Sequence, residues 1–348
     1  MKPLPVLLPL GWMYRLGMAL RNLFFDMRVV QSRRIDVPVI SVGNMTSGGT
    51  GKTPIVELIV KTLERLNVRA AVVSRGYGRR SRGMREVSTG NSIASTVQEA
   101  GDEAFQLATR LPGVPVVVDE DRVRGAEHAV KSLGARAVVL DDGFQHRRMH
   151  RDLDIVLIDV SRSPFRTAML PAGYLREPLG GLRRADVVIF TRIGRDEDQR
   201  DLRQQIGSRS KAAILTSSYR ITSFRRAKSK FSVDLSGLKG KHVVAFCGIG
   251  NPEGFRHSLV ELGLVVDAML EFDDHRWYVR EDLDRIVEER KKLGSEYIVT
   301  TEKDFVRLSY PEYFDHHPFF YVEGEAEVHE PELWDAVISR VLEGRAKR

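Results

Sequence analysis

Apolar and polar positions alternate with two different periods along this 348-residue chain. Short runs of apolar residues, typical of buried strands, are followed by longer stretches with apolar residues three or four positions apart, typical of helices. The predicted strands are 37–42, 70–74, 115–118, 136–140, 154–158, 186–190 and 212–216, and the predicted helices are 54–66, 97–110 and 121–133. This alternation predicts an α/β fold with βαβ units and a largely parallel sheet covered by helices.

A second, shorter α/β series follows a polar, basic segment at 222–230, which we interpret as a linker. Its predicted strands are 242–247, 264–270 and 296–300, its predicted helices are 253–262 and 280–292, and a last helical pattern covers 331–342. We therefore predict an N-terminal helix in 1–30, a main domain in 31–224, and a smaller α/β domain in 225–348 that includes the C-terminal helix.

The N-terminal segment predicts an amphipathic helix. Its apolar side chains recur at helical spacing and share one face: Trp12, Leu16, Leu20, Leu23, Met27 and Val30. Arg15, Arg21 and Asp26 interrupt the apolar run, so no stretch of about 18 uncharged apolar residues exists to cross a bilayer. Arg15 also argues against a cleaved signal peptide. Two interpretations stay open: a helix lying in the membrane interface, or a helix packed on its own domain.

Composition narrows the class of protein. Hydrophobic content of 42% with 29% charged residues is ordinary for a folded chain. The single cysteine, Cys247, excludes an intramolecular disulfide and fits a reducing compartment. A net charge of +7 favours anionic partners. The basic run 74–85 is short and offers only Tyr77 for stacking, so we predict an anionic small substrate or lipid head group there, or a solvated loop, and no nucleic-acid partner.

A phosphate-binding loop follows the first predicted strand, in "SVGNMTSGGTGKTP" at 41–54. The segment matches G-x-x-x-x-G-K-[ST] except at its first position, which is Thr46. In this interpretation Lys52 reaches the β and γ phosphates and the Thr53 hydroxyl binds Mg²⁺. The predicted phosphate-binding residues are Thr46, Ser47, Gly48, Gly49, Thr50, Gly51, Lys52 and Thr53.

Two carboxylates follow the predicted strand 136–140. Asp141 and Asp142 occupy the position at which a Walker-B carboxylate holds Mg²⁺ in proteins with such a loop. The strand Val187–Phe190 is followed by "TRIGRD" and not by the guanine-reading N-K-x-D, so we predict ATP as the nucleotide. His146 and His150 lack a suitable third zinc ligand.

Eight segments together carry a family resemblance. They occur in order along most of the chain: "VGNMTSGGTGKTP" (42–54), "SRGYGR" (74–79), "GDEA" (101–104), "DDGFQHR" (141–147), "LREP" (175–178), "GIGNP" (248–252), "FDDH" (272–275) and "TEKD" (301–304). In these segments the sequence resembles the tetraacyldisaccharide 4'-kinases of Gram-negative bacteria. It departs from the family pattern at Ala104, where the family commonly has proline.

The resemblance implies an activity. It is the ATP- and Mg²⁺-dependent phosphorylation of the 4'-hydroxyl of a tetraacylated glucosamine disaccharide 1-phosphate, giving lipid IVA in lipid A biosynthesis. The implied location is the cytoplasmic face of the inner membrane, with peripheral or monotopic attachment through the N-terminal helix. The implied partners are the glycolipid and the inner membrane surface, with no obligate protein partner.

The resemblance also implies roles for individual residues. Asp102 becomes the candidate base, paired with His275 from the smaller domain, and Arg122 the candidate clamp on ATP phosphates or substrate. Asp141, Asp142 and Glu177 become candidates for Mg²⁺ and its water shell, in an order that the sequence does not rank. Two alternatives remain: a membrane-recruited P-loop ATPase switch, and a soluble P-loop kinase of a small metabolite.

Overall fold

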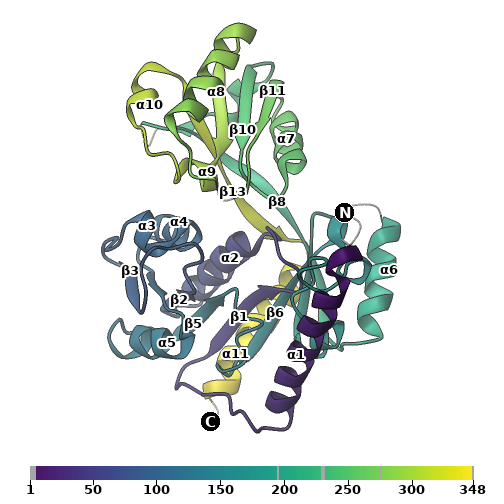
Figure 1. The fold of residues 1–348 in the computed structure, drawn as a ribbon. Coiled ribbons are helices and arrows are strands. Elements are labelled where there is room, and N and C mark those ends of the chain that lie inside the picture. The colour runs from purple at the N-terminus through teal and green to yellow at the C-terminus, as the bar shows by residue number, and fades with distance from the viewer. Residues whose placement is uncertain (1–4, 194–195, 229–231, 275, 347–348) are drawn as a thin grey trace. The chain divides into compact units, whose positions relative to one another are not determined.

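The computed structural model describes residues 5–193, 196–228, 232–274 and 276–346. The chain divides into two compact units, one of residues 1–218 with 326–348 and the other of residues 219–325. Strands β8 (Ala213–Arg226) and β13 (Phe319–Val328) carry the chain from one unit into the other (Figure 1).

The first unit contains a mostly parallel sheet. Its strand order is β8-β7-β6-β1-β5-β2-β4-β3, and β3 alone runs antiparallel to its neighbour among these pairs. The strands are β1 (Val39–Asn44), β2 (Ala70–Ser74), β3 (Arg85–Thr89), β4 (Pro115–Val118), β5 (Ala137–Asp141), β6 (Leu153–Asp159) and β7 (Val187–Thr191). The predicted α/β class with a parallel sheet is confirmed. Because β1 lies between β5 and β6, the ends of these three strands meet at one edge, where ligands bind in such sheets.

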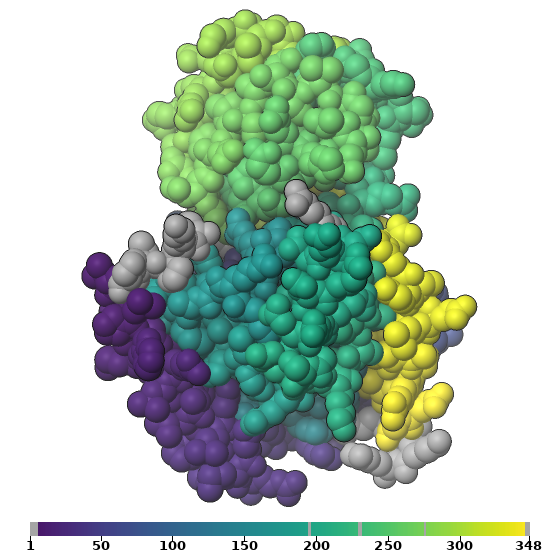
Figure 2. All heavy atoms as spheres, turned by 90° about the vertical axis from the view of Figure 1, so that its right-hand side faces the viewer, coloured from purple at the N-terminus to yellow at the C-terminus, as the bar shows by residue number. Residues whose placement is uncertain are grey.

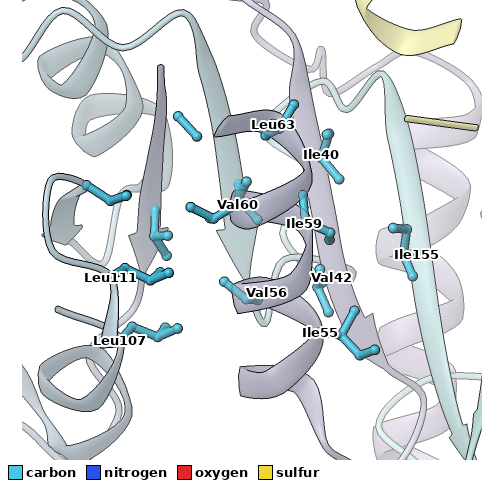
Figure 3. Close-up of a cluster of buried hydrophobic side chains, with 14 of the residues drawn as sticks. Ile40, Val42, Ile55, Val56, Ile59, Val60, Leu63, Leu107, Leu111 and Ile155 are labelled. Carbon is cyan, nitrogen blue, oxygen red and sulfur yellow. The ribbon is translucent and has the colours of Figure 1, made fainter. Parts of the chain in front are cut away.

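Helices cover both faces of this sheet, because its strands are apolar on both sides. One face packs on α2 (Lys52–Arg65), α4 (Asp102–Arg110) and α11 (Pro331–Ala346), and the other packs on α5 (Arg122–Lys131) and α6 (Asp196–Gly207). Figure 3 shows Ile55 and Ile59 of α2 beside Ile40 and Val42 of β1. Alternate residues of one strand face opposite layers: Ile40 and Val42 face α2, whereas Val39 packs with the α5 layer.

The N-terminal helix α1 (Leu8–Asp26) follows a short 3₁₀ turn (Pro5–Leu7) and lies on the surface of the first unit (Figures 1 and 2). Its apolar side chains point outward, with Trp12 72%, Met13 71% and Leu16 62% exposed, and only Gly11 is buried. Within the residues that the structure describes, no helix is long and apolar enough to cross a membrane.

The second unit has its own sheet, in the order β11-β10-β12-β13-β8, with the short β9 (Ser232–Val233) paired to β8. Strand β10 (His242–Cys247) lies between β11 (Val265–Glu271) and β12 (Tyr297–Thr301) and is parallel to both. Helix α7 (Pro252–Glu261) packs on one face, and α8 (Arg280–Leu293) and α10 (Glu312–His316) pack on the other. Two further short helices are α3 (Val97–Ala100) in the first unit and α9 (Glu302–Phe305) in the second.

The structure corrects the predicted division of the chain. The C-terminal helix α11 belongs to the first unit, because Trp334 is buried there and its indole Nε1 donates to Thr62 Oγ1 at 3.1 Å. The predicted linker is also wrong in its first part, since residues 222–226 continue β8. Polar side chains suggested a linker, but the buried Ile221 and Phe224 lie among them and pack into the core of the second unit.

Candidate phosphate-binding and catalytic site

The phosphate loop connects β1 to α2, as its sequence predicts. Gly48 and Gly51 have positive φ angles of 109° and 86°, which side chains with a Cβ rarely adopt. The Asn44 amide Nδ2 donates to Thr50 Oγ1 at 2.9 Å, and the Thr191 hydroxyl donates to the Thr50 carbonyl at 3.1 Å. Thr50 is therefore held through both its side chain and its carbonyl. The first turn of α2 follows directly, and the backbone N–H groups of a helix N-terminus favour anions.

Thr46 stands where the motif prefers glycine. It is 92% buried and forms an isolated bridge with Leu175, and the Ser47 N–H donates to the Tyr174 carbonyl at 2.8 Å. This start of the loop thus pairs like a short strand with the 174–175 segment. Extended backbone suits a β-branched residue, which explains why threonine is accommodated at this position.

Lys52 begins α2 and faces the second carboxylate of the tandem pair. Its Nζ lies 3.7 Å from Asp142 Oδ1, and Arg176 binds the same carboxylate through two contacts of 2.6 and 2.9 Å. Burial alone acts to raise the pKa of Asp142, but the cations Lys52, Arg176 and Arg122 outweigh it and hold that pKa well below its usual value. Asp142 is therefore a carboxylate at any physiological pH.

Asp141, the last residue of β5, has a different environment. Its Oδ2 accepts a hydrogen bond from Ser74 Oγ at 3.0 Å, whereas Oδ1 is buried and has no hydrogen-bond partner among the described residues. Burial, together with the nearby Glu103 carboxylate, raises the pKa of Asp141 to about 7. A buried carboxylate oxygen without a donor beside a phosphate loop fits a cation or its bound water.

Glu177 is 99% buried, and both oxygens of its carboxylate accept hydrogen bonds from other side chains. Its Oε1 accepts from Gln145 Nε2 at 2.8 Å, and its Oε2 accepts from Arg184 Nη2 at 2.8 Å and from Asn22 Nδ2 at 3.3 Å. The Gln145 amide also donates to the Asn44 carbonyl at 2.9 Å, at the end of β1. Glu177 is thus tied to the start of the phosphate loop through one side chain.

Arg122 begins α5 and interacts electrostatically with both tandem carboxylates. It is 92% buried, and the charge of Asp142 is the strongest electrostatic stabilisation of its guanidinium. Its Nη1 lies 3.5 Å from His146 Nδ1, and burial together with Arg122 lowers the pKa of His146 to about 4. The imidazole is therefore neutral at pH 7.

Asp102 is buried at the first position of α4. The predicted helix 97–110 is broken there, because Gly101 has a φ of 85° and separates α3 from α4. A Cβ on Gly101 would lie 2.7 Å from the Tyr77 carbonyl oxygen, so the "SRGYGR" and "GDEA" segments pack directly on each other. His275 lies outside the residues that the structure describes, and its predicted pairing with Asp102 remains a prediction.

A cavity of about 230 Å³ adjoins the phosphate loop. Residues 46–50 form one side of it, and the other side contains Asp159, Arg162, Tyr174 and Arg192. Arg192 donates to the Gly49 carbonyl at 2.5 Å and forms an ion pair with Asp159. The cavity is therefore positively charged and reaches the loop backbone.

Some of these residues were not predicted. Gln145, Arg176 and Glu103 lie within the motifs "DDGFQHR", "LREP" and "GDEA", so the motifs marked the segments without indicating which side chains converge. Asn22 had no such signal, because its contact with Glu177 joins positions 155 residues apart.

A parallel α/β sheet with a lysine-bearing phosphate loop, a tandem carboxylate on the neighbouring strand and clustered arginines defines the class of P-loop phosphotransferases. A family model of the tetraacyldisaccharide-1-P 4'-kinases (LpxK) matches residues 4–343. The chain belongs to this family and is accordingly a kinase.

Individual relatives agree with this assignment. The tetraacyldisaccharide 4'-kinase of Chlorobaculum parvum is 42% identical over 308 residues, covering 87% of this chain and 84% of its own. That of Syntrophotalea carbinolica is 41% identical over 312 residues, covering 87% and 83%. A crystal structure of LpxK from Aquifex aeolicus in complex with ATP superposes with a TM-score of 0.77 at 31% identity, covering 97% of this chain and 98% of the other.

Proposed function

We propose that this chain transfers the γ-phosphate of ATP to the 4'-hydroxyl of a tetraacyldisaccharide 1-phosphate, giving lipid IVA. The observation that carries the proposal is the placement of Lys52, beside Asp142 and Arg176, at the N-terminus of α2 in a chain of this family. The phosphate loop and Lys52 hold the ATP phosphates, and the buried Arg122 adds a second cation. The arginine-lined cavity at residues 46–50 receives another part of the nucleotide.

The site offers Mg²⁺ a small number of protein ligands and not a complete shell of them. Among the described residues no three acidic, histidine or cysteine side chains converge into a metal site. Asp142 is bound by Arg176, and Glu177 is bound by Gln145 and Arg184. Asp141, in contrast, has one oxygen without a hydrogen-bond partner among the described residues. Asp141 and Thr53 would therefore hold Mg²⁺ together with ATP oxygens, which is how this ion is usually bound, and Asp142 and Glu177 would act through its water shell. When bound, the ion neutralises charge on the transferring phosphoryl group.

Asp102 is our candidate for the base. In the proposed reaction its carboxylate accepts the proton of the 4'-hydroxyl while that oxygen bonds to the γ-phosphorus, and the bond to the bridging oxygen of ADP breaks. The tight contact between Gly101 and Tyr77 fixes the start of α4, and hence the backbone from which Asp102 extends. His275 keeps the role of its partner on the family resemblance alone.

Attachment to the cytoplasmic face of the inner membrane completes the proposal. The outward apolar face of α1 supports an interfacial helix over a helix packed by that face on its own domain. A glycolipid whose acyl chains stay in the bilayer would then reach the site without leaving the membrane.

The first experiment measures label transfer from γ-labelled ATP to purified tetraacyldisaccharide 1-phosphate in mixed micelles. We expect Lys52→Ala to lose at least about 100-fold of the transfer rate, because it removes a preorganised cation from the developing phosphoryl charge. Lys61→Ala, on the same helix, is the matched control. Label on free phosphate only, in the wild-type protein, would refute the lipid kinase and favour the ATPase switch.

The same assay tests Asp102. Asp102→Asn preserves the shape of the side chain but removes the proton acceptor, so we expect kcat to fall by about 100-fold or more while KM for ATP changes little. A kcat equal to that of the wild type would remove Asp102 from the chemistry.

A further inference from the structure

Helix α1 has a second, polar face that contacts the first unit. Arg21 and Asn22 follow Tyr14 by seven and eight positions, about two helical turns, which places all three on one side of the helix. These side chains are polar, whereas the exposed side chains of Trp12 and Leu16 are apolar. A helix serving only as a lipid anchor needs no specific polar contacts with its domain.

These polar side chains all reach the segments that form the proposed catalytic site. The Asn22 amide Nδ2 donates to Glu177 Oε2 at 3.3 Å. Arg21 Nη2 donates to the Gln145 carbonyl, and Tyr14 donates to the Arg176 carbonyl at 3.0 Å. The helix thus contacts "DDGFQHR" and "LREP" at once.

The contacted residues are one hydrogen bond away from the phosphate loop. Arg176 binds the Asp142 carboxylate, which faces Lys52, and it also donates to Asn44 Oδ1 at 3.0 Å. Gln145 joins Glu177 to the Asn44 carbonyl. A displacement of α1 would therefore change the positions of carboxylates that surround the proposed metal and nucleotide.

Side chains of the first unit also contact the end of α1. Arg147, of the same "DDGFQHR" segment, donates to the Asn22 carbonyl at 3.0 Å and to Asp26 Oδ1 at 2.7 Å. Arg183 forms a second ion pair with Asp26, and the Arg147 guanidinium lies 5.0 Å from the centre of the Phe25 ring. The end of α1 is thus clamped where Asn22 meets Glu177.

We propose that α1 is a positioning element of the phosphoryl-transfer site and that Asn22 is the positioning residue through which it acts on Glu177. Glu177 is buried, and Asn22 supplies one of its donors, so removal of that donor leaves the carboxylate less restrained. This inference rests on the proposed function. It gives α1 a role in metal and nucleotide binding that is independent of lipid.

The test uses the full-length protein and Mn²⁺ as a spectroscopic probe of the Mg²⁺ site. Electron paramagnetic resonance measures Mn²⁺ affinity in the presence of a non-hydrolysable ATP analogue, so no lipid acceptor is required. We expect Asn22→Ala to weaken Mn²⁺ binding by about 5-fold, less than the roughly 10-fold typical of residues that hold a direct metal ligand, because Glu177 acts through the water shell. Asn91→Ala, an exposed asparagine after β3, is the matched control.

A double-mutant cycle separates positioning from general damage. If Asn22 acts through Glu177, Asn22→Ala in a Glu177→Gln background should change Mn²⁺ affinity and kcat by less than about twofold. Asn22→Leu, similar in size and a good helix former, repeats the measurement should the alanine variant unfold.

Two results would overturn the inference: wild-type Mn²⁺ affinity in a folded Asn22 variant, or full additivity with Glu177→Gln. Failure of label transfer to the lipid in the wild-type protein would instead refute the proposed function, because the Mn²⁺ measurement does not depend on the acceptor.

Discussion

At the scale of single residues, the tandem aspartates show how neighbouring positions acquire opposite properties. Asp142 is surrounded by Lys52, Arg176 and Arg122, which keep it ionised. Asp141 is fully buried at the end of β5, with one oxygen paired to Ser74 and the other unpaired among the described residues. Asp142 therefore pairs with cations of the protein itself, whereas Asp141 has an oxygen available to a bound cation.

This contrast predicts opposite effects of two isosteric substitutions on the metal-free protein. The folded pKa of Asp141, about 7, lies above its ordinary value of 3.8, so its contribution to stability is present at low pH and is lost as the pH rises toward 7. Asp141→Asn should therefore raise Tm in EDTA, more at about pH 8 than at about pH 5. Asp142 has a depressed pKa, so Asp142→Asn should lower Tm at both pH values.

Thermal unfolding followed by circular dichroism checks both variants. A lower Tm for Asp141→Asn at about pH 8 would show that the carboxylate, although buried, stabilises the empty site.

At the scale of elements, α1 combines two surfaces with different partners. Its polar face contacts the catalytic segments through Asn22 and Arg21, and its apolar face is exposed. The sequence left two interpretations of this helix open, and the structure shows that it packs on its domain with the polar face. In the interpretation of a helix packed on its own domain, the apolar face would have been the inner one; the structure shows that face exposed.

The exposed face predicts membrane attachment that substitutions can remove. Trp12→Glu combined with Leu16→Glu should reduce binding to vesicles of phosphatidylethanolamine and phosphatidylglycerol by at least about 10-fold, because burying each such side chain contributes roughly 1.5–3 kcal/mol. Cosedimentation with the vesicles provides the measurement. Leu66→Glu, which alters an exposed leucine just after α2, is the control, and equal binding of the double variant would exclude α1 as the lipid contact.

At the scale of the whole molecule, the two units share strands and not only a linking segment. The chain leaves the first unit through β8 and returns through β13, after which α11 packs on α2. The predicted single domain boundary after residue 224 could not represent this path, because the first unit is made of two separate segments of the chain. The sequence pattern supplied the elements of each unit, but a return of the chain to its first unit depends on which apolar surface the last helix buries.

The sequence by itself determined the local chemistry of this protein. Strand and helix periodicity predicted the α/β class, and the motifs identified the phosphate loop, Lys52, the tandem aspartates and the kinase family, because these properties depend on residues close together in the chain. Only the tertiary structure decided which face of α1 is exposed, where α11 packs, and how Arg176, Gln145 and Asn22 converge on the carboxylates. These contacts join positions far apart in sequence, and burial and charge there follow from the folded arrangement as a whole.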